Sequence, residues 1–167
     1  RHIHLTNRRQ RQMCIRDRNE YLSSLGTGIE IDKDAIKVSE KNKEFLLNKD
    51  RLIFLERDFS SFDTSSFDIV ISNPPYIPFE EKNNIMEDVR NFEPKKALFA
   101  DEKGLYFYRN MIKNLANKMK RKQYLFLEVG INQHDGVVKI LKNNNFKVIS
   151  IKNDISNIPR CIIAESN

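Results

Sequence analysis

The chain has 167 residues, 40% of them hydrophobic, which is enough for one domain with a buried core. No apolar run approaches the length of a transmembrane helix and no signal-peptide pattern is visible, so we expect a soluble, cytoplasmic protein. The net charge of +6 is local, because residues 1–18 hold six Arg and one Asp, whereas the rest holds 23 Lys and Arg against 22 Asp and Glu. This nearly neutral remainder argues against direct nucleic-acid binding.

Residues 1–18 differ in style from the rest of the chain. They lack helical or strand periodicity, and their last six residues, MCIRDR, resemble a translated sequencing-adapter stretch. We therefore expect a non-native basic tail over residues 1–18 and the structured domain over residues 19–167; a basic arm for RNA and a nuclear-type basic cluster are the alternatives. The two cysteines, Cys14 and Cys161, and the isolated His134 indicate neither a disulfide framework nor a metal site.

From Gly26 onward, short apolar runs alternate with longer amphipathic stretches, which is typical of an α/β fold with a mostly parallel sheet flanked by helices. The expected strands cover residues 28–31, 52–56, 68–72, 124–129, 147–151 and 161–164. The expected helices cover residues 33–47, 80–89, 104–119 and 133–143. Ligands of such sheets bind beyond the carboxyl ends of the strands, so residues at strand ends are the first candidates for a site.

The first candidate is Glu30, at the end of the first expected strand. An ionised carboxylate offers two acceptor oxygens and can accept hydrogen bonds from both hydroxyls of a ribose. The alternative is a structural role at the start of the next helix, for which we expect Asp32 to be the cap.

The second candidate is Asp58-Phe59, two residues beyond the expected strand at 52–56. A carboxylate there could accept a hydrogen bond from an adenine amino group while the phenylalanine ring packs against the base. A surface-loop acid beside a core phenylalanine is the alternative.

The third candidate is the run SNPPYIP, residues 72–78. Two successive prolines have no N–H to donate to a β-ladder, so the strand must end here. The prolines also stiffen the turn, which presents the Asn73 carboxamide and the Pro74 carbonyl as acceptors beside the Tyr76 ring. This arrangement suits a planar –NH2 substrate, because holding both hydrogens fixes the nitrogen. A strand-terminating turn with a core tyrosine is the alternative.

Six stretches of the chain resemble one protein family. They are GIEIDKDAIKVSEKN, RLIFLERDF, FDIVISNPPYIP, FEPKKALFADEKGLYFYRNMI, LFLEVGINQ and ISNIPRCIIAE. From about residue 20 to the C-terminus, the chain resembles the catalytic domain of the HemK/PrmC family, the protein-(glutamine-N5) methyltransferases that modify peptide chain release factors. Adenine-N6 DNA methyltransferases share NPPY. The blocks Phe92-Glu93-Pro94…Ala97-Leu98 and Glu128-Val129-Gly130…Gln133 indicate the protein-methylating branch.

The resemblance implies a Rossmann-like class I methyltransferase fold and S-adenosylmethionine as the cofactor. Carried over to this sequence, it implies that Glu30 binds the ribose of the cofactor. It also implies that Asp58 and Phe59 contact the adenine, and that Asn73 lies between cofactor and substrate. No metal is implied.

For the substrate, the resemblance implies that Asn73, Pro74, Pro75 and Tyr76 are the catalytic residues. They would grip the glutamine side-chain amide of the Gly-Gly-Gln motif in a release factor. An amide nitrogen is a poor nucleophile, so this grip would favour attack by nitrogen over attack by oxygen by fixing the orientation of the –NH2 group.

The chain departs from the family pattern at its beginning. Family members place a glycine-rich loop after their first strand, where it lets the cofactor approach the backbone closely. The glycines at residues 26–28 precede a strand, and we interpret Gly26-Thr27-Gly28 as a turn into it. We therefore expect the first strand and the glycine-rich loop to be missing, which would leave sheet edges unpaired.

Two alternatives to a release-factor methyltransferase stay open. An adenine-N6 DNA or RNA methyltransferase would share NPPY, but it would need a basic groove or a target-recognition segment, and residues 19–167 show neither. An inactive methyltransferase fragment is the other alternative, and the missing glycine-rich loop favours it for the chain as it stands.

Overall fold

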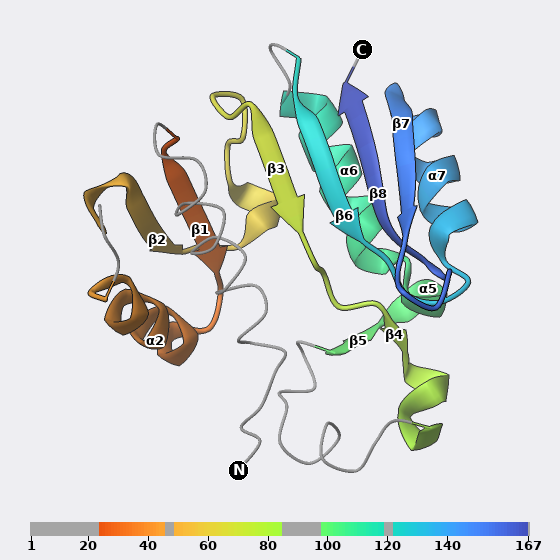
Figure 1. Ribbon diagram of the computed structural model, residues 1–167, viewed down its shortest axis with the longest axis horizontal. Helices are drawn as coiled ribbons and strands as arrows, with labels where there is room; N and C mark the ends of the chain where they lie inside the picture. The colour runs from red at the N-terminus through yellow and green to blue at the C-terminus, as the bar shows by residue number, and fades with distance from the viewer. Residues whose placement is uncertain (1–23, 46–48, 85–97, 119–121, 167) are drawn as a thin grey trace. The chain divides into compact units, whose positions relative to one another are not determined.

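The computed structural model describes residues 24–45, 49–84, 98–118 and 122–166 (Figure 1). The described residues form two compact units, one ending at Phe62 and the other beginning at Asp63. The expected tail over residues 1–18 and the block at residues 92–97 lie outside the described residues. In the described part of the chain, no helix is both long enough and apolar enough to cross a bilayer.

The described part of the first unit is a two-stranded parallel sheet with one α-helix. Its elements are β1 (Gly26–Glu30), α2 (Lys33–Lys43), η1 (Lys49–Arg51), β2 (Leu52–Glu56) and η2 (Phe59–Ser61). The helix starts where the sequence predicts, because the Asp32 carboxylate accepts hydrogen bonds from the N–H groups of Asp34 and Ala35, both at 2.9 Å. The connection between β1 and α2 is residues 31–32, which contain no glycine.

The interpretation of Gly26-Thr27-Gly28 as a turn is wrong. All three residues belong to β1, which pairs in parallel with β2 from Gly26 opposite Leu52 to Glu30 opposite Glu56. A Cβ atom on Gly28 would lie 2.5 Å from the Phe54 ring, so glycine leaves the space that the neighbouring strand's side chain fills. Glycine serves close strand packing here and does not turn the chain.

The second unit is built on a four-stranded sheet. Its strands are β3 (Ile69–Ser72), β6 (Tyr124–Glu128), β8 (Pro159–Ser166) and β7 (Phe146–Asn153), in that spatial order. β3 and β6 pair in parallel, and β8 is antiparallel to both of its neighbours, so three of the four strands run the same way. This confirms the α/β class with a mostly parallel sheet.

Shorter elements connect these strands. They are β4 (Ile77–Pro78), η3 (Phe79–Asn84), β5 (Phe99–Ala100), α5 (Asp101–Gly104), α6 (Tyr106–Lys118) and α7 (His134–Asn143). The expected helix at 80–89 is a 3-10 helix in its described part, and its last residues lie outside the described ranges. The helix expected from residue 104 starts at Tyr106, after a turn with positive φ angles.

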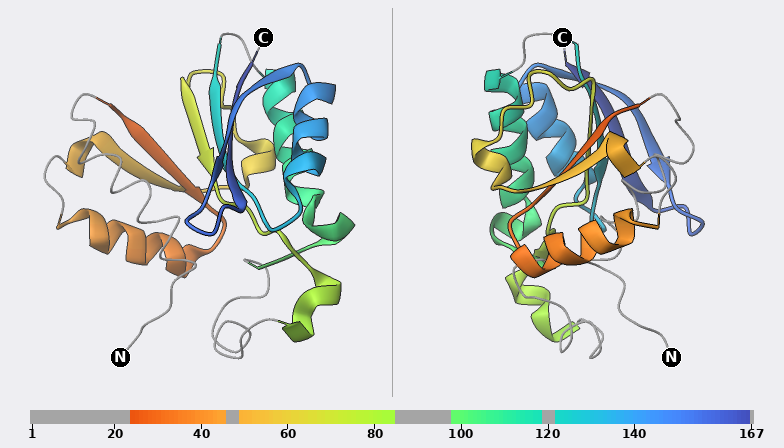
Figure 2. Two further views of the ribbon diagram at one scale, coloured as in Figure 1. Left: turned by 45° about the vertical axis from the view of Figure 1, so that its right-hand side comes forward. Right: turned by 90° about the vertical axis from the view of Figure 1, so that its left-hand side faces the viewer.

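The core of the second unit lies between the sheet and two helices. Figures 1 and 2 show α6 and α7 side by side along one face of the sheet. By register, alternate residues of β3, β6 and β8 share one face, and they are buried: Val70, Leu125, Leu127, Ile162 and Ala164. The apolar face predicted for the helix supplies Tyr108, Met111, Ile112 and Leu115, all buried. This packing holds the strand ends on which the candidate site is built.

Candidate active site

The Asn-Pro-Pro-Tyr run, residues 73–76, starts directly after β3, as the proline argument predicts. Pro74 is buried, and Asn73, Pro75 and Tyr76 are half-buried. The chain then enters β4, where Ile77 pairs with Phe99 and Pro78 pairs with Ala100 of β5. Residues 73–76, which we call the corner, are therefore held between β3 of the four-stranded sheet and the short pair formed by β4 and β5.

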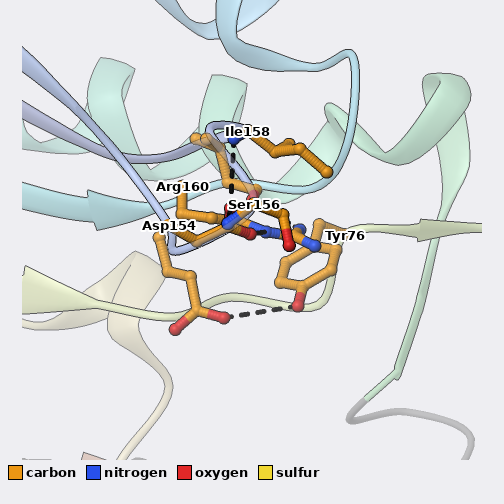
Figure 3. Close-up of polar contacts among 7 residues, drawn as sticks. Tyr76, Asp154, Ser156, Ile158 and Arg160 are labelled. Carbon is orange, nitrogen blue, oxygen red and sulfur yellow. Dashed lines mark hydrogen bonds and ion pairs between the residues drawn. The ribbon is translucent and has the colours of Figure 1, made fainter.

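Tyr76 is held at both of its ends. Its hydroxyl donates to Oε1 of Glu128, the last residue of β6, at 3.3 Å (Figure 3). Its backbone carbonyl accepts a hydrogen bond from Nε2 of Gln133 at 2.6 Å. Because β3 and β6 are adjacent parallel strands, both contacts lie at the carboxyl end of the sheet. The Tyr76 ring is therefore fixed where sheets of this kind bind ligands.

Two glycines make room for this arrangement. A Cβ atom on Gly130 would lie 2.9 Å from Cδ2 of Tyr76, and a Cβ atom on Gly104 would overlap the Tyr76 carbonyl oxygen and the Gln133 carboxamide. Gly104 has a φ of 82°, and Glu102 and Lys103 before it each have a φ of 55°. Non-glycine residues rarely adopt this backbone conformation, and it is often found at functional sites.

A buried tyrosine supports the end of β6 from the helix side. The Tyr108 hydroxyl donates to the backbone carbonyl of Glu128 at 2.7 Å. Burial raises the pKa of Tyr108 far above its ordinary value, so the phenol stays protonated and remains a donor at physiological pH. Glu128 is thus held through its main chain by Tyr108, while its side chain contacts Tyr76.

The turn between β7 and β8 reaches the same strand end (Figure 3). Arg160 Nε lies 3.1 Å from Oδ2 of Asp154, and Arg160 Nη1 donates to the Val129 carbonyl at 3.4 Å. Asp154 Oδ1 accepts from the N–H groups of Ser156 and Ile158, and the bond from Ile158 is the main cause that lowers the Asp154 pKa. The guanidinium group is therefore oriented beside the residue that follows Glu128.

The cofactor candidates lie at the carboxyl end of the sheet in the first unit. Glu30 ends β1, and its Oε1 accepts from the N–H groups of Ile31 and Asp32 at 2.9 and 3.0 Å. The Arg57 N–H donates to the Glu30 carbonyl at 3.0 Å, which places Asp58 one residue beyond this contact. Glu30 and Asp58 thus share one sheet edge, as the sequence predicts for residues that end adjacent parallel strands.

The two carboxylates differ in how their local contacts use them. Asp58 Oδ1 accepts from the Ser60 N–H at 2.8 Å, and this bond, with a further contribution from the Ser60 side chain, lowers the pKa of Asp58. Glu30 Oε2 makes no hydrogen bond to any residue that the structure describes. Phe59 follows, half-buried, in η2. Charged acceptors of this kind fit the hydroxyl and amino donors of a nucleoside.

The structure assembles the predicted site as two groups. Glu30, Asp58 and Phe59 belong to the first unit, and the corner belongs to the second. The convergence of both groups on one cofactor stays a prediction. No cluster of three metal-binding side chains occurs among residues 24–45, 49–84, 98–118 and 122–166.

Sequence reasoning gave no structural role to several residues that hold the corner. The family resemblance covers Glu128, Gly130 and Gln133 only as one block of the sequence. The helical periodicity predicts Tyr108 only as part of an apolar helix face. Gly104 was assigned to a helix, and Arg160 was only part of the stretch ISNIPRCIIAE. The signal available was the GLYFYR stretch, in which a glycine precedes the expected apolar helix face that contains Tyr108.

Comparison with known proteins finds release factor glutamine methyltransferases and bifunctional methyltransferases among the relatives. No protein-family model matches the chain. The release factor glutamine methyltransferase of Fusobacterium nucleatum is 41% identical over 150 residues, which is 88% of this chain and 42% of that protein. The release factor glutamine methyltransferase of Thermodesulfovibrio yellowstonii is 34% identical over 141 residues, which is 84% of this chain and 50% of that protein. The chain thus spans about half the length of these relatives.

Solved structures show the same fold at low sequence identity. The precorrin-6y C5,15-methyltransferase of Geobacter metallireducens matches with a TM-score of 0.56 at 12% identity, covering 93% of this chain and 73% of that one. The [4+2]-cyclase SpnF matches with a TM-score of 0.62 at 10% identity, covering 93% of this chain and 70% of that one. These matches confirm the Rossmann-like methyltransferase fold. The sequence relatives, which the chain matches over 88% and 84% of its own length, are named release factor glutamine methyltransferases, in agreement with the resemblance to the HemK/PrmC family.

Proposed function

We propose that this chain is the catalytic part of an enzyme that transfers a methyl group from S-adenosylmethionine to the side-chain amide nitrogen of a glutamine in a peptide chain release factor. One observation carries the proposal: the corner is held at the carboxyl end of β3 by contacts to Tyr76 from Glu128 and Gln133. Two relatives, 41% and 34% identical to this chain, are named release factor glutamine methyltransferase. The proposed location is the cytoplasm, where release factors act.

The cofactor supplies an electrophilic methyl group when it is bound. We assign the ribose hydroxyls to Glu30, whose Oε2 is available among the described residues, and the adenine amino group to Asp58. Phe59 would pack against the adenine. The Ser60 hydrogen bond lowers the pKa of Asp58, so this carboxylate is ionised at neutral pH and both of its oxygens are acceptors.

The corner binds and orients the substrate in this proposal. The Asn73 carboxamide oxygen and the Pro74 carbonyl accept the two hydrogens of the glutamine –NH2 group, and Pro75 keeps the turn rigid. The Tyr76 ring packs beside the amide plane. Alignment of a weak nucleophile is the main contribution of the protein, because the methyl donor is already reactive.

A methyl-transfer assay tests this function. Because the relatives are about twice as long, the assay uses this chain and the same chain extended to their length, with labelled cofactor and an intact release factor. We expect label on the glutamine of the Gly-Gly-Gln motif and none on a release factor with Ala at that glutamine. Label on adenine in added DNA or RNA would favour the alternative reaction, and no binding of cofactor by the extended chain would contradict both.

Replacing Asn73 with Ala tests the role of the corner. We expect Asn73→Ala to lower kcat by roughly 100-fold or more, because the amide would lose one of the acceptors that hold it in line. The affinity for S-adenosylmethionine, measured by calorimetry, should fall much less than kcat. An Asn73→Ala enzyme with unchanged kcat would remove the corner from the mechanism.

A further inference from the structure

Gln133 joins three segments of the second unit through a single carboxamide. Its Nε2 donates to the carbonyls of Tyr76 and Lys103, at 2.6 and 3.0 Å, and its Oε1 accepts from the Gly130 N–H at 3.2 Å. Both of its side-chain N–H groups are therefore used. The residue is 8% exposed, so these bonds form away from bulk water.

The position of Gln133 in the chain makes this use unusual. It is the residue that precedes α7, where a side chain commonly caps the helix, but its side chain makes no capping hydrogen bond. Instead it reaches a carbonyl 57 residues earlier in the chain. The other carbonyl it binds belongs to Lys103, in the segment whose φ angles are positive. Gly104 and Gly130 leave the space for the carboxamide, since a Cβ atom on either would overlap it.

We infer that Gln133 is a positioning residue for methyl transfer, which fixes the backbone of the corner through the Tyr76 carbonyl. The inference rests on the proposed function. Tyr76 ends the corner, so its carbonyl position determines how the preceding Asn73 and Pro74 present their acceptors. A shift of about 1 Å in such a group can reduce a rate by roughly 100-fold. Gln133 contacts neither the substrate amide nor the cofactor in this scheme and acts through Tyr76.

The chain offers a matched control in Gln123. This glutamine is fully buried, and its Nε2 donates to the carbonyls of Thr64 and Phe67 at 2.5 and 2.8 Å. It precedes β6, whereas Gln133 follows that strand, so the two lie beyond opposite ends of it. Gln123→Glu and Gln133→Glu remove the same kind of double donation, and both should destabilise the fold. Only the second should change the corner.

The test compares Gln133→Glu, Gln133→Leu and Gln123→Glu in the extended chain with an intact release factor. We expect both Gln133 variants to lower kcat by roughly 10- to 100-fold while the KM for S-adenosylmethionine changes by less than about threefold. Gln123→Glu should keep kcat within about twofold at a temperature where it is folded. Loss of kcat in Gln133→Glu alone would reflect only charge repulsion and would overturn the inference, as would equal losses in Gln123→Glu.

A second readout needs no activity. In NMR spectra of tyrosine-labelled protein, Gln133→Leu should shift or broaden the ring signals of Tyr76, and Gln123→Glu should leave them in place. Unchanged Tyr76 signals in Gln133→Leu would overturn the positioning role even if kcat fell as expected. A wild-type enzyme that labels no release factor, with Tyr76 signals that respond as expected, would contradict the proposed reaction and leave the structural link between Gln133 and the corner standing.

Discussion

Tyr108 is the buried residue that ties helix α6 to the end of β6. Its side chain is fully buried, and its hydroxyl donates to the Glu128 carbonyl at 2.7 Å. Burial raises its pKa, so the donor is present throughout the ordinary pH range. The same Glu128 accepts the hydroxyl of Tyr76 with its side chain. A single hydroxyl group in the core therefore supports the residue that orients the ring of the corner.

Tyr108→Phe removes this hydroxyl and keeps the ring. The Glu128 carbonyl loses a donor in a buried environment, so we expect unfolding to become easier by about 1–3 kcal/mol. Urea denaturation monitored by circular dichroism measures this change. Tyr106→Phe is a suitable control, because Tyr106 is exposed on the same helix. Equal stability of the Tyr108→Phe protein and the wild type would show that the bond contributes nothing net.

At the scale of elements, the turn between β7 and β8 depends on one carboxylate. Asp154 accepts two backbone hydrogen bonds within the turn and pairs with Arg160, and the bond from the Ile158 N–H is the largest cause of its lowered pKa. A carboxyl group whose pKa is lower in the folded state stabilises the fold above its unfolded-state pKa. That contribution is lost as the pH falls through the folded-state pKa.

Asp154→Asn should therefore destabilise the protein at pH 7, and this effect should shrink as the pH falls through the lowered pKa of Asp154. Thermal unfolding of both proteins at pH 7 and at an acidic pH measures the difference in Tm. Asp101→Asn is the control, because Asp101 is exposed and its side chain makes no hydrogen bond to the described residues. A Tm difference for Asp154→Asn that is the same at both pH values would contradict the charge argument.

At the scale of the whole molecule, the described parts of the two units differ in how much apolar surface they bury. The second unit contains the fully buried side chains of β6, β8, α6 and α7: Leu125, Leu127, Ile162, Tyr108, Ile112, Leu115 and Leu141. In the described part of the first unit, the buried hydrophobic residues are Ala35 and Leu52. A two-stranded sheet with so small a core is expected to open more readily than a four-stranded sheet covered by helices.

Hydrogen exchange of the 167-residue chain should reveal this difference. We expect the amides of Leu125 and Leu127 to exchange at least about tenfold more slowly than those of Ile29 and Leu55, which lie in β1 and β2. Mass spectrometry of peptides from each strand gives the two rates. Equal protection of β1, β2 and β6 would mean that the chain unfolds as one cooperative body.

Much of the local structure was predictable because its causes lie within a few residues. The strand at 52–56 has the bounds that its apolar run predicts, and the two prolines end β3 at Ser72 as their missing N–H groups require. Asp32 caps α2 through bonds to residues two and three positions later. The prediction failed at Gly26-Thr27-Gly28, where packing against Phe54 of the neighbouring strand overrides the turn preference of glycine.

The sequence by itself determined the α/β class, the stop after β3 and the candidates Glu30, Asp58 and the corner, because periodicity, proline and strand-end carboxylates act locally. Only the tertiary structure decided that β8 is antiparallel between β6 and β7 and that the Gln133 carboxamide holds the Tyr76 carbonyl. The physical reason is distance along the chain. Tyr76 makes hydrogen bonds to Glu128 and Gln133, which lie 52 and 57 positions later in the chain. No local sequence pattern predicts a hydrogen bond between residues that only the packed sheet brings together.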